Sequence, residues 1–242
     1  MNSSIKSKLR KRIWDLMLRK GIATFPLPHH GRIPNFIGAE KAADRLSRMD
    51  IYRSADVIKI NPDSPQKPVR YLALSDGKVV IMPTPRISKG FLLLNPRLIP
   101  SSEYQRASTI KGAFKYGKII HPKDLPNVDL IVVGSVVVDV WGNRLGKGEG
   151  YSELEYGILS MLGKVDESTP IVTTVHDVQV ISERIPRDPW DYTVDYIITP
   201  TRVVRALEKY RPKGILWELL PKDKIREIPL LRKLRDELGV KD

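Results

Sequence analysis

The chain has 242 residues, of which 41% are hydrophobic and 29% charged, a composition typical of a folded globular protein and not of a disordered segment. It has no cysteine, which excludes disulfides, thiolate metal sites and a cysteine nucleophile, and its longest apolar run, residues 130–138, is too short for a membrane-spanning helix of ~20 residues. The net charge of +13 has three interpretations, which are a solvated basic surface, an anionic small-molecule substrate, or nucleic acid, the last less favoured because the charge is spread along the chain.

A first helix is expected from Ser3 to Lys20, with Gly21 as its stop. Its apolar residues recur at near-helical spacing: Ile5, Leu9, Ile13 and Leu16. Lys6 lies near the helix N-terminus, where the dipole disfavours a cation, and it repels Arg10 one turn later. A bound anion would remove both penalties, although exposed cations can also tolerate them. No apolar stretch follows this basic start, so no secretory signal is predicted and a cytoplasmic location is expected.

Prolines predict an irregular loop over residues 24–38, after which helices and strands alternate. The expected helices cover 39–49, 69–75, 151–162 and 202–210, and the expected strands cover 55–60, 78–82, 91–94, 129–139, 170–175, 194–199 and 215–217. Continuous apolar strands between helices predict a largely parallel sheet covered on both faces. We therefore expect one three-layer α/β/α domain over residues 1–242, in which residues 222–242 form a surface helix or a partly ordered tail.

A glycine-rich loop, Gly146 to Gly150, follows the strand richest in Val and Ile and precedes a helix. Glycines permit positive φ angles, and their N–H groups, together with a helix N-terminus, form an anion site. Arg144 and Lys147, as exposed loop cations, would add charge-assisted bonds to phosphate. The Gly-x-Gly-x-Gly spacing matches neither a P-loop nor the dinucleotide fingerprint. The loop is therefore either an anion site or an ordinary strand-to-helix turn.

The loop is the second of three motifs that occur in a fixed order. Residues 6–10 have the pattern Lys-x-x-Leu-Arg, residues 144–151 are Arg-Leu-Gly-Lys-Gly-Glu-Gly-Tyr, and residues 191–195 are Asp-Tyr-Thr-Val-Asp. The first and third are similar to the Lys-x-x-Leu-Arg and Asp-x-x-Val-Asp motifs of the 5-formyltetrahydrofolate cyclo-ligases, also called methenyltetrahydrofolate synthetases. The second resembles that family's signature, Arg-Leu-Gly-Arg/Lys-Gly-Gly-Gly-Tyr-Tyr-Asp.

The resemblance implies a three-layer α/β fold and an enzyme that uses ATP and Mg²⁺ to convert 5-formyltetrahydrofolate, or a related N-formyl compound, to 5,10-methenyltetrahydrofolate. The formyl oxygen would attack the γ-phosphate, and N10 would then close the ring as phosphate leaves. Such a reaction needs positioning and charge neutralisation more than a protein nucleophile. By position in the motifs, phosphate would be held by Lys6, Arg10, Arg144 and Lys147, the triphosphate would be surrounded by Gly146, Gly148, Gly150 and Tyr151, and Mg²⁺ would be held by Glu153 and Asp191.

Four positions depart from the family pattern. They are Ser152 in place of the second Tyr, Glu153 in place of Asp, Glu149 in place of the middle glycine, and Asp63, the only acid near the place of a Glu that contacts the pterin. The last departure puts the pterin contact in question. Residues 25–36 are foreign to the compact enzymes and, with residues 148–151, are similar to the divergent methenyltetrahydrofolate synthetase domain-containing branch. A nucleotide- or RNA-binding paralogue without turnover therefore stays open as an alternative.

Two histidine-containing pairs and two tryptophans are further candidates. Residues 29–30 (His-His) would point apart on a strand, which disfavours a shared metal ion. Residues 176–177 (His-Asp) follow a predicted strand and are either an acid–base pair or a turn. Trp14 borders the apolar stripe and is expected in the core, whereas Trp141 lies just before the loop, where it could stack on a pterin or adenine.

Overall fold

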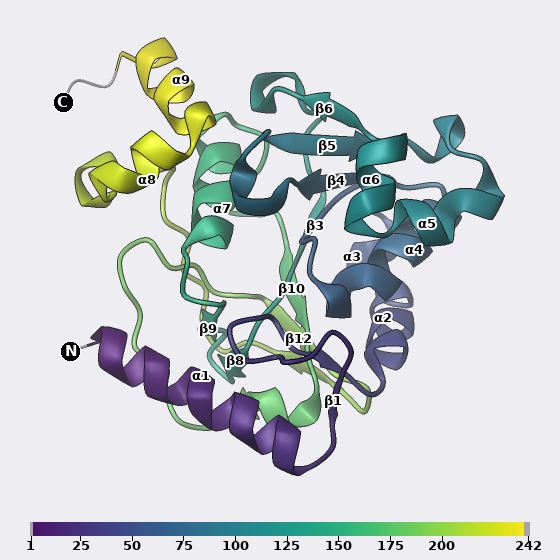
Figure 1. Ribbon diagram of the computed structural model, residues 1–242, viewed down its shortest axis with the longest axis vertical. Coiled ribbons are helices and arrows are strands. Elements are labelled where there is room, and N and C mark those ends of the chain that lie inside the picture. Colours follow the sequence, from purple (N-terminus) through teal and green to yellow (C-terminus); the bar gives the residue numbers. More distant parts are fainter. Residues whose placement is uncertain (1, 240–242) are drawn as a thin grey trace.

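An eight-stranded sheet forms the centre of the computed structural model, which describes residues 2–239 (Figure 1). Its strand order is β13-β12-β10-β7-β3-β4-β5-β6. In chain order the strands are β3 (Val57–Ile60), β4 (Val79–Pro83), β5 (Phe91–Leu94), β6 (Lys118–Ile120), β7 (Leu130–Val133), β10 (Ile171–Thr174), β12 (Tyr196–Ile198) and β13 (Val203–Arg205). The five strands from β12 to β4 pair in parallel, and β13, β5 and β6 are antiparallel additions at the two edges.

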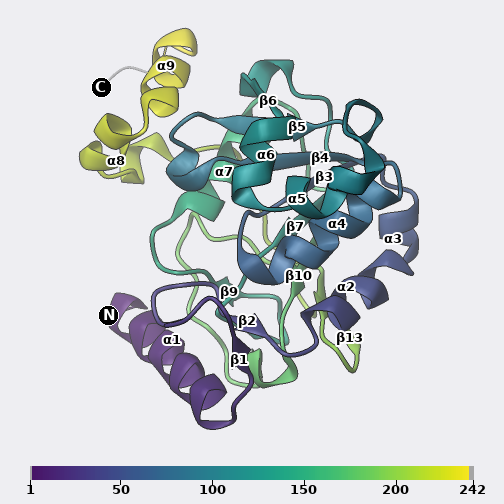
Figure 2. The ribbon, with the colours of Figure 1, turned by 45° about the vertical axis from the view of Figure 1, so that its right-hand side comes forward.

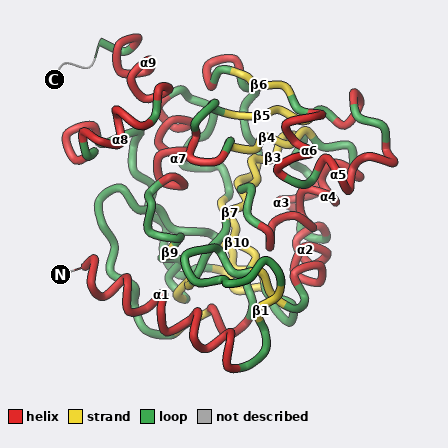
Figure 3. Tube along the Cα trace, viewed as in Figure 1, coloured by secondary structure: helices red, strands yellow, loops and turns green. Residues whose placement is uncertain are grey.

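Helices cover both faces of this sheet, which confirms the predicted three-layer α/β architecture. One face carries α2 (Ala39–Ser47), α4 (Lys67–Ser75), α5 (Tyr104–Ala107) and α6 (Ile110–Tyr116), and the other carries α7 (Tyr151–Met161) and α9 (Pro229–Glu237). Alternate residues of each strand serve the two sides, because successive side chains of a strand point to opposite faces. In β7, Leu130 and Val132 face the first group, while Ile131 and Val133 face the second. Figure 3 shows the strands as a yellow band between the two groups of helices.

A smaller sheet lies beside the central one and positions the glycine-rich loop. It consists of β8 (Val137–Asp139), β9 (Arg144–Leu145) and β11 (Val180–Ile181), in the order β11-β8-β9. The N-terminal helix α1 (Asn2–Arg19) packs against β8 and buries Leu9, Ile13 and Met17. The short strands β1 (Ala23–Thr24) and β2 (Asn35–Phe36) form a hairpin next to α1 (Figure 2). As a result, α1 and the loop between β9 and α7 lie close together.

Several sequence-based expectations are corrected by the structure. The predicted strand 129–139 is two strands, because the chain leaves the central sheet at Gly134 and enters the small sheet. The prediction of a helix over 202–210 is wrong. This segment begins with the strand β13 and continues as irregular chain, because Val203 and Val204 pair with β12. The predicted strand 215–217 gives way to a 3₁₀ turn, Trp217–Leu219, since β13 already occupies that edge of the sheet.

The C-terminal segment also differs from the expected surface helix or tail. It forms two helices, α8 (Lys222–Glu227) and α9, and Leu231 and Leu234 of α9 are fully buried against the core. Residues 240–242 of the expected tail lie outside the described residues. The α3 helix (Asp50–Arg53) completes the set of α-helices in the described part of the chain. None of the described helices is both long enough and apolar enough to cross a membrane.

Candidate active site

A pocket of about 710 Å³ opens at the carboxyl ends of the central strands. One wall consists of the residues that directly follow β3, β4 and β7, namely residues 61–64, 84–86 and Gly134. The rest of the lining comes mainly from α1, the glycine-rich loop, the start of α7, and residues of the segments 26–33 and 188–191. Ligands of open, mostly parallel α/β sheets bind at the carboxyl ends of the strands. The pocket is therefore where this architecture is expected to bind a ligand.

The structure brings all the site residues expected from the sequence to this one pocket. Its lining includes Lys6, Arg10, Arg144, Gly146, Lys147, Gly148, Gly150, Tyr151, Glu153 and Asp191. These residues come from three motifs that lie far apart in the sequence, and the pocket is the place where the fold joins them.

The glycine-rich loop needs glycine for two separate reasons. Gly148 and Gly150 have φ angles of +102° and +76°, which side-chain-bearing residues rarely adopt. In addition, a Cβ atom on Gly148 would lie 3.3 Å from the guanidinium carbon of Arg10. Arg10 Nε donates a hydrogen bond of 2.7 Å to the carbonyl oxygen of Gly146. The loop thus folds directly against a cation of α1.

Lys6 is buried near the start of α1 and is not an unbalanced charge. Its Nζ donates to Asp188 Oδ2 and to Asp191 Oδ2, each at 2.6 Å. Burial raises the pKa of Asp191, although the ammonium of Lys6 opposes that shift. The two carboxylates therefore offset the unfavourable interactions of Lys6 with the helix dipole and with Arg10. Only Asp191 of these two aspartates belongs to a sequence motif, so Asp188 was not predicted.

Arg144 differs from the exposed loop cation expected from the sequence. Its side chain is 1% exposed, and it donates to Glu153 Oε1 at 2.5 Å and to the hydroxyl of Tyr192 at 3.1 Å. A further bond runs to the carbonyl oxygen of Gly134. The expectation of exposure is wrong because β9 carries Arg144 inward, beneath the loop and over the ring of Tyr192. Arg144 therefore also ties Glu153 in place.

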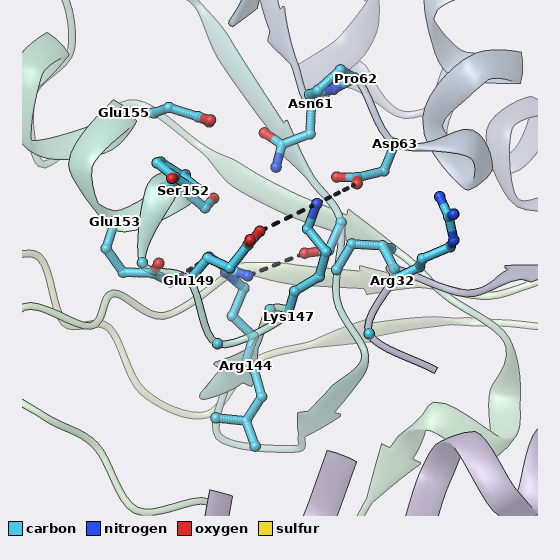
Figure 4. Close-up of a pocket in the computed structure, with 18 of the residues that line it drawn as sticks. Arg32, Asn61, Pro62, Asp63, Arg144, Lys147, Glu149, Ser152, Glu153 and Glu155 are labelled. Carbon is cyan, nitrogen blue, oxygen red and sulfur yellow. Dashed lines mark hydrogen bonds and ion pairs between the residues drawn. The ribbon is translucent and has the colours of Figure 1, made fainter. Parts of the chain in front are cut away.

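Lys147 is the loop cation with the loosest contacts. Its Nζ lies 3.7 Å from Asp63 Oδ1 and 3.8 Å from Glu149 Oε2, and 36% of its side chain is exposed. Figure 4 shows it reaching between these two carboxylates from opposite walls of the pocket. Glu149 and Asp63, two of the departures from the family pattern, thus both lie next to the same lysine.

Three buried polar residues at the pocket wall were missed by the sequence analysis. Lys59 on β3 is 1% exposed, and its Nζ contacts Asn61 Oδ1 and Glu155 Oε2, each at 2.5 Å. Asn61 and Glu155 line the pocket. Burial raises the pKa of Glu155, although Lys59 opposes this shift. A lysine within the apolar run of β3 was the available sequence signal, because a fully buried lysine is rarely unpaired.

The remaining candidates make structural contacts, and of these His30 also lines the pocket. His29 and His30 are a loop pair with stacked rings, bonded to the Trp14 carbonyl and to Asp15 respectively. Residues 176–177 form a turn, one of the two alternatives, in which His176 Nδ1 caps a 3₁₀ helix. Trp14 packs against the core, as expected. Trp141 is not part of the pocket lining and lies under Arg184 instead, whereas Trp190, which the sequence analysis missed, lines the pocket.

The carboxylates Glu153 and Asp191 lie near each other in the pocket. Among the described residues no group of three or more His, Asp or Glu side chains is arranged to hold a metal ion. Glu153 and Asp191 nevertheless lie close enough for Glu153 to raise the pKa of Asp191 further, a smaller effect than burial. Mg²⁺ is commonly bound by one or two carboxylates together with phosphate oxygens. This pair therefore fits a cation that arrives with a phosphate ligand.

The chain resembles known proteins in both sequence and fold. Methenyltetrahydrofolate synthase domain-containing proteins of Bos taurus and Mus musculus are 40% and 41% identical to it over 238 and 236 residues, in each case 96% of this chain. The chain spans 62% and 63% of the length of these relatives. The NMR structure of Aquifex aeolicus 5,10-methenyltetrahydrofolate synthetase matches with a TM-score of 0.53 at 22% identity, over 88% of this chain and 98% of that chain. This last likeness concerns the fold.

The family resemblance expected from the three motifs is confirmed over most of the chain. The model of the 5-formyltetrahydrofolate cyclo-ligase family matches residues 2–200, a range that contains all three motifs and the whole parallel part of the sheet. The relatives named above also agree with the predicted divergent branch. The chain belongs to the 5-formyltetrahydrofolate cyclo-ligase family.

Proposed function

We propose that this protein is an ATP- and Mg²⁺-dependent cyclo-ligase that converts 5-formyltetrahydrofolate, or a related N-formyl compound, to its cyclic methenyl product. The observation that carries the proposal is the meeting of Lys6, Arg10, Lys147 and the glycine-rich loop in one pocket with the carboxylates Glu153 and Asp191. The family to which the chain belongs supports the same reaction.

The charges of the pocket favour a ligand that carries both anions and a cation. Lys6 is paired with Asp191, Arg144 with Glu153, and Lys147 lies near Asp63. A ligand with phosphate groups alone would attract these cations but repel their carboxylate partners. A Mg²⁺–triphosphate complex would meet both needs, since phosphate would contact the cations while Glu153 and Asp191 turned to the metal ion. When bound, Mg²⁺ would neutralise charge on the phosphate oxygens.

The chemistry needs no protein nucleophile. The formyl oxygen attacks the γ-phosphorus and ADP leaves; N10 then attacks the formyl carbon, loses its proton, and phosphate leaves with the former formyl oxygen. In this scheme Lys6, Arg10 and Lys147 hold the transferred phosphoryl group and offset its negative charge. The N–H groups of the loop around Gly148 add donors without side-chain bulk.

The direct test is to incubate the protein with 5-formyltetrahydrofolate, ATP and Mg²⁺ and to follow the absorbance of the methenyl product together with ADP release. We expect equal amounts of the two products. The Lys147→Ala variant should slow the reaction, whereas Lys118→Ala, which removes an exposed lysine of β6 outside the pocket, should not. ATP binding without a methenyl product would overturn the folate reaction and favour a nucleotide-binding protein without turnover.

A further inference from the structure

Lys59, Asn61 and Glu155 form a buried cluster whose arrangement goes beyond holding the fold together. Lys59 alternates with Ile58 and Ile60 along β3, so its side chain points to the face covered by α7. There its Nζ holds Asn61 Oδ1 and Glu155 Oε2 at the same distance, 2.5 Å. The amide and the carboxylate are therefore neighbours, fixed by one shared ammonium group.

The cluster fixes which atoms of Asn61 and Glu155 are left for a ligand. Because Lys59 Nζ donates to the amide oxygen of Asn61, the Nδ2 group of Asn61 faces away from the ammonium. Among the described residues, neither this Nδ2 nor Glu155 Oε1 has a hydrogen-bond partner. Both atoms are accessible to solvent. Both residues line the pocket, and Figure 4 shows the Glu155 carboxylate pointing toward the amide of Asn61.

The backbone of Asn61 is held as firmly as its side chain. Its N–H donates 3.0 Å to the carbonyl oxygen of Val132, and its carbonyl oxygen accepts a hydrogen bond from the buried guanidinium of Arg70. Asn61 itself is 5% exposed. Groups held in this way are preorganised, so they lose little entropy when a ligand binds.

We infer that Asn61 and Glu155 recognise the N–H and C=O edge of a six-membered cyclic amide. Asn61 Nδ2 would donate to the carbonyl oxygen, and Glu155 Oε1 would accept from the neighbouring ring N–H. Both the pterin of a folate and the base guanine carry such an edge. The assignment of a pterin as the ligand rests on the proposed function. The assignment of a cyclic amide edge does not.

Donor and acceptor can be exchanged here without a change in size or net charge. The double variant Asn61→Asp/Glu155→Gln replaces the donor by an acceptor and the acceptor by a donor. It leaves oxygen atoms on both residues for Lys59, and it also leaves one carboxylate beside the lysine. A 4-amino-4-deoxy pterin presents the exchanged edge, in which a ring nitrogen acceptor lies next to an amino donor. Adenine differs from guanine in the same way. A ligand with the wrong edge leaves buried polar groups unpaired, which lowers affinity by roughly 10- to 100-fold.

Calorimetric titration with two matched ligand pairs tests the inference. The pairs are 5-formyltetrahydrofolate with its 4-amino-4-deoxy analogue, and guanosine with adenosine, which carry no phosphate. We expect the wild-type protein to prefer the cyclic amide of at least one pair, and the double variant to reverse that preference by roughly 10- to 100-fold. A merely structural cluster would change the melting temperature but not the ratio of the two affinities.

The outcomes separate this inference from the proposed function. Unchanged affinity ratios in a folded double variant, in both pairs, overturn the inference, even if methenyl product still forms in the wild-type protein. Reversal only in the guanosine pair, without methenyl product, supports the inference and removes the folate reaction. Should the double variant not fold, Asn61→Asp, which keeps an oxygen for Lys59, must still abolish the wild-type preference.

Discussion

At the scale of single residues, Lys147 and Arg144 belong to one motif but have opposite environments. Lys147→Ala should weaken ATP binding by roughly 10- to 150-fold, because a charge-assisted bond to phosphate contributes ~1.5–3 kcal/mol. It should lower the free energy of unfolding by less than about 1 kcal/mol, because its ion pairs are partly exposed and long. Arg144→Ala should instead destabilise the fold by about 3–5 kcal/mol, since it leaves Glu153 without its buried partner.

Calorimetric titration with ATP and thermal denaturation of both variants measure these effects, with Lys118→Ala as the matched control at an exposed position outside the pocket. The assignment of Lys147 to phosphate fails if ATP affinity is unchanged in Lys147→Ala. A folding defect in that variant as large as that of Arg144→Ala would also contradict the contrast between the two residues.

Tyr192 provides a pH-dependent test of the buried contacts beneath the loop. Burial raises its pKa from 10.0 to about 12. Between these values the unfolded chain releases the phenolic proton while the folded chain keeps it, so stability falls as pH rises from 10 to 12. The expected loss is on the order of 3 kcal/mol. Denaturant titrations across this range should show a smaller slope with pH for Tyr192→Phe than for the wild-type protein; equal slopes would contradict the buried placement.

The residues of the site divide into those that a motif can reveal and those that only folding brings near. Lys6, Arg10 and the glycine-rich loop were predicted because a family signature contains them. Asp188 was not, because its contact with Lys6 joins residues 182 positions apart. Glu155 was missed for the same reason, since its partner Lys59 is 96 positions away and neither belongs to a motif.

At the scale of elements, segments with periodic apolar residues were predicted well. Segments whose structure depends on pairing at the edge of the sheet were not. The central strands and helices α1, α2, α4 and α7 appear near their predicted positions. The break at Gly134 was missed, and only the fold reveals the tertiary contact there: a Cβ atom on Gly134 would lie 2.9 Å from Gln66 Oε1. The strand β13 was predicted as a helix because local propensity does not indicate that β12 needs an edge partner.

The α9 helix allows a test of whether the C-terminal segment is part of the core. Leu234 is fully buried, whereas Leu238, four residues later, is 42% exposed. Leu234→Ala should lower the free energy of unfolding by about 2–5 kcal/mol because it creates a cavity. Leu238→Ala should have an effect of less than about 1 kcal/mol. Chemical denaturation measures both, and equal effects would show that α9 does not pack as described.

At the scale of the whole molecule, the fold brings together segments that lie far apart in the sequence. The first helix, the strand ends of the central sheet, the glycine-rich loop and residues 188–191 all reach the same pocket. Sequence patterns predicted the layers, because apolar periodicity records which faces are buried. They did not predict the small sheet β11-β8-β9, whose short strands carry no periodic signal, although this sheet sets the loop against α1.

A crystal structure of the protein with Mg²⁺ and a non-hydrolysable ATP analogue would decide whether this pocket is the nucleotide site. We expect the terminal phosphates within hydrogen-bonding distance of Lys6, Arg10 and Lys147, and the cation beside Glu153 and Asp191. A triphosphate bound outside the pocket, for example at the basic surface of α2 around Arg45, would contradict the assignment of the glycine-rich loop and the reaction proposed from it.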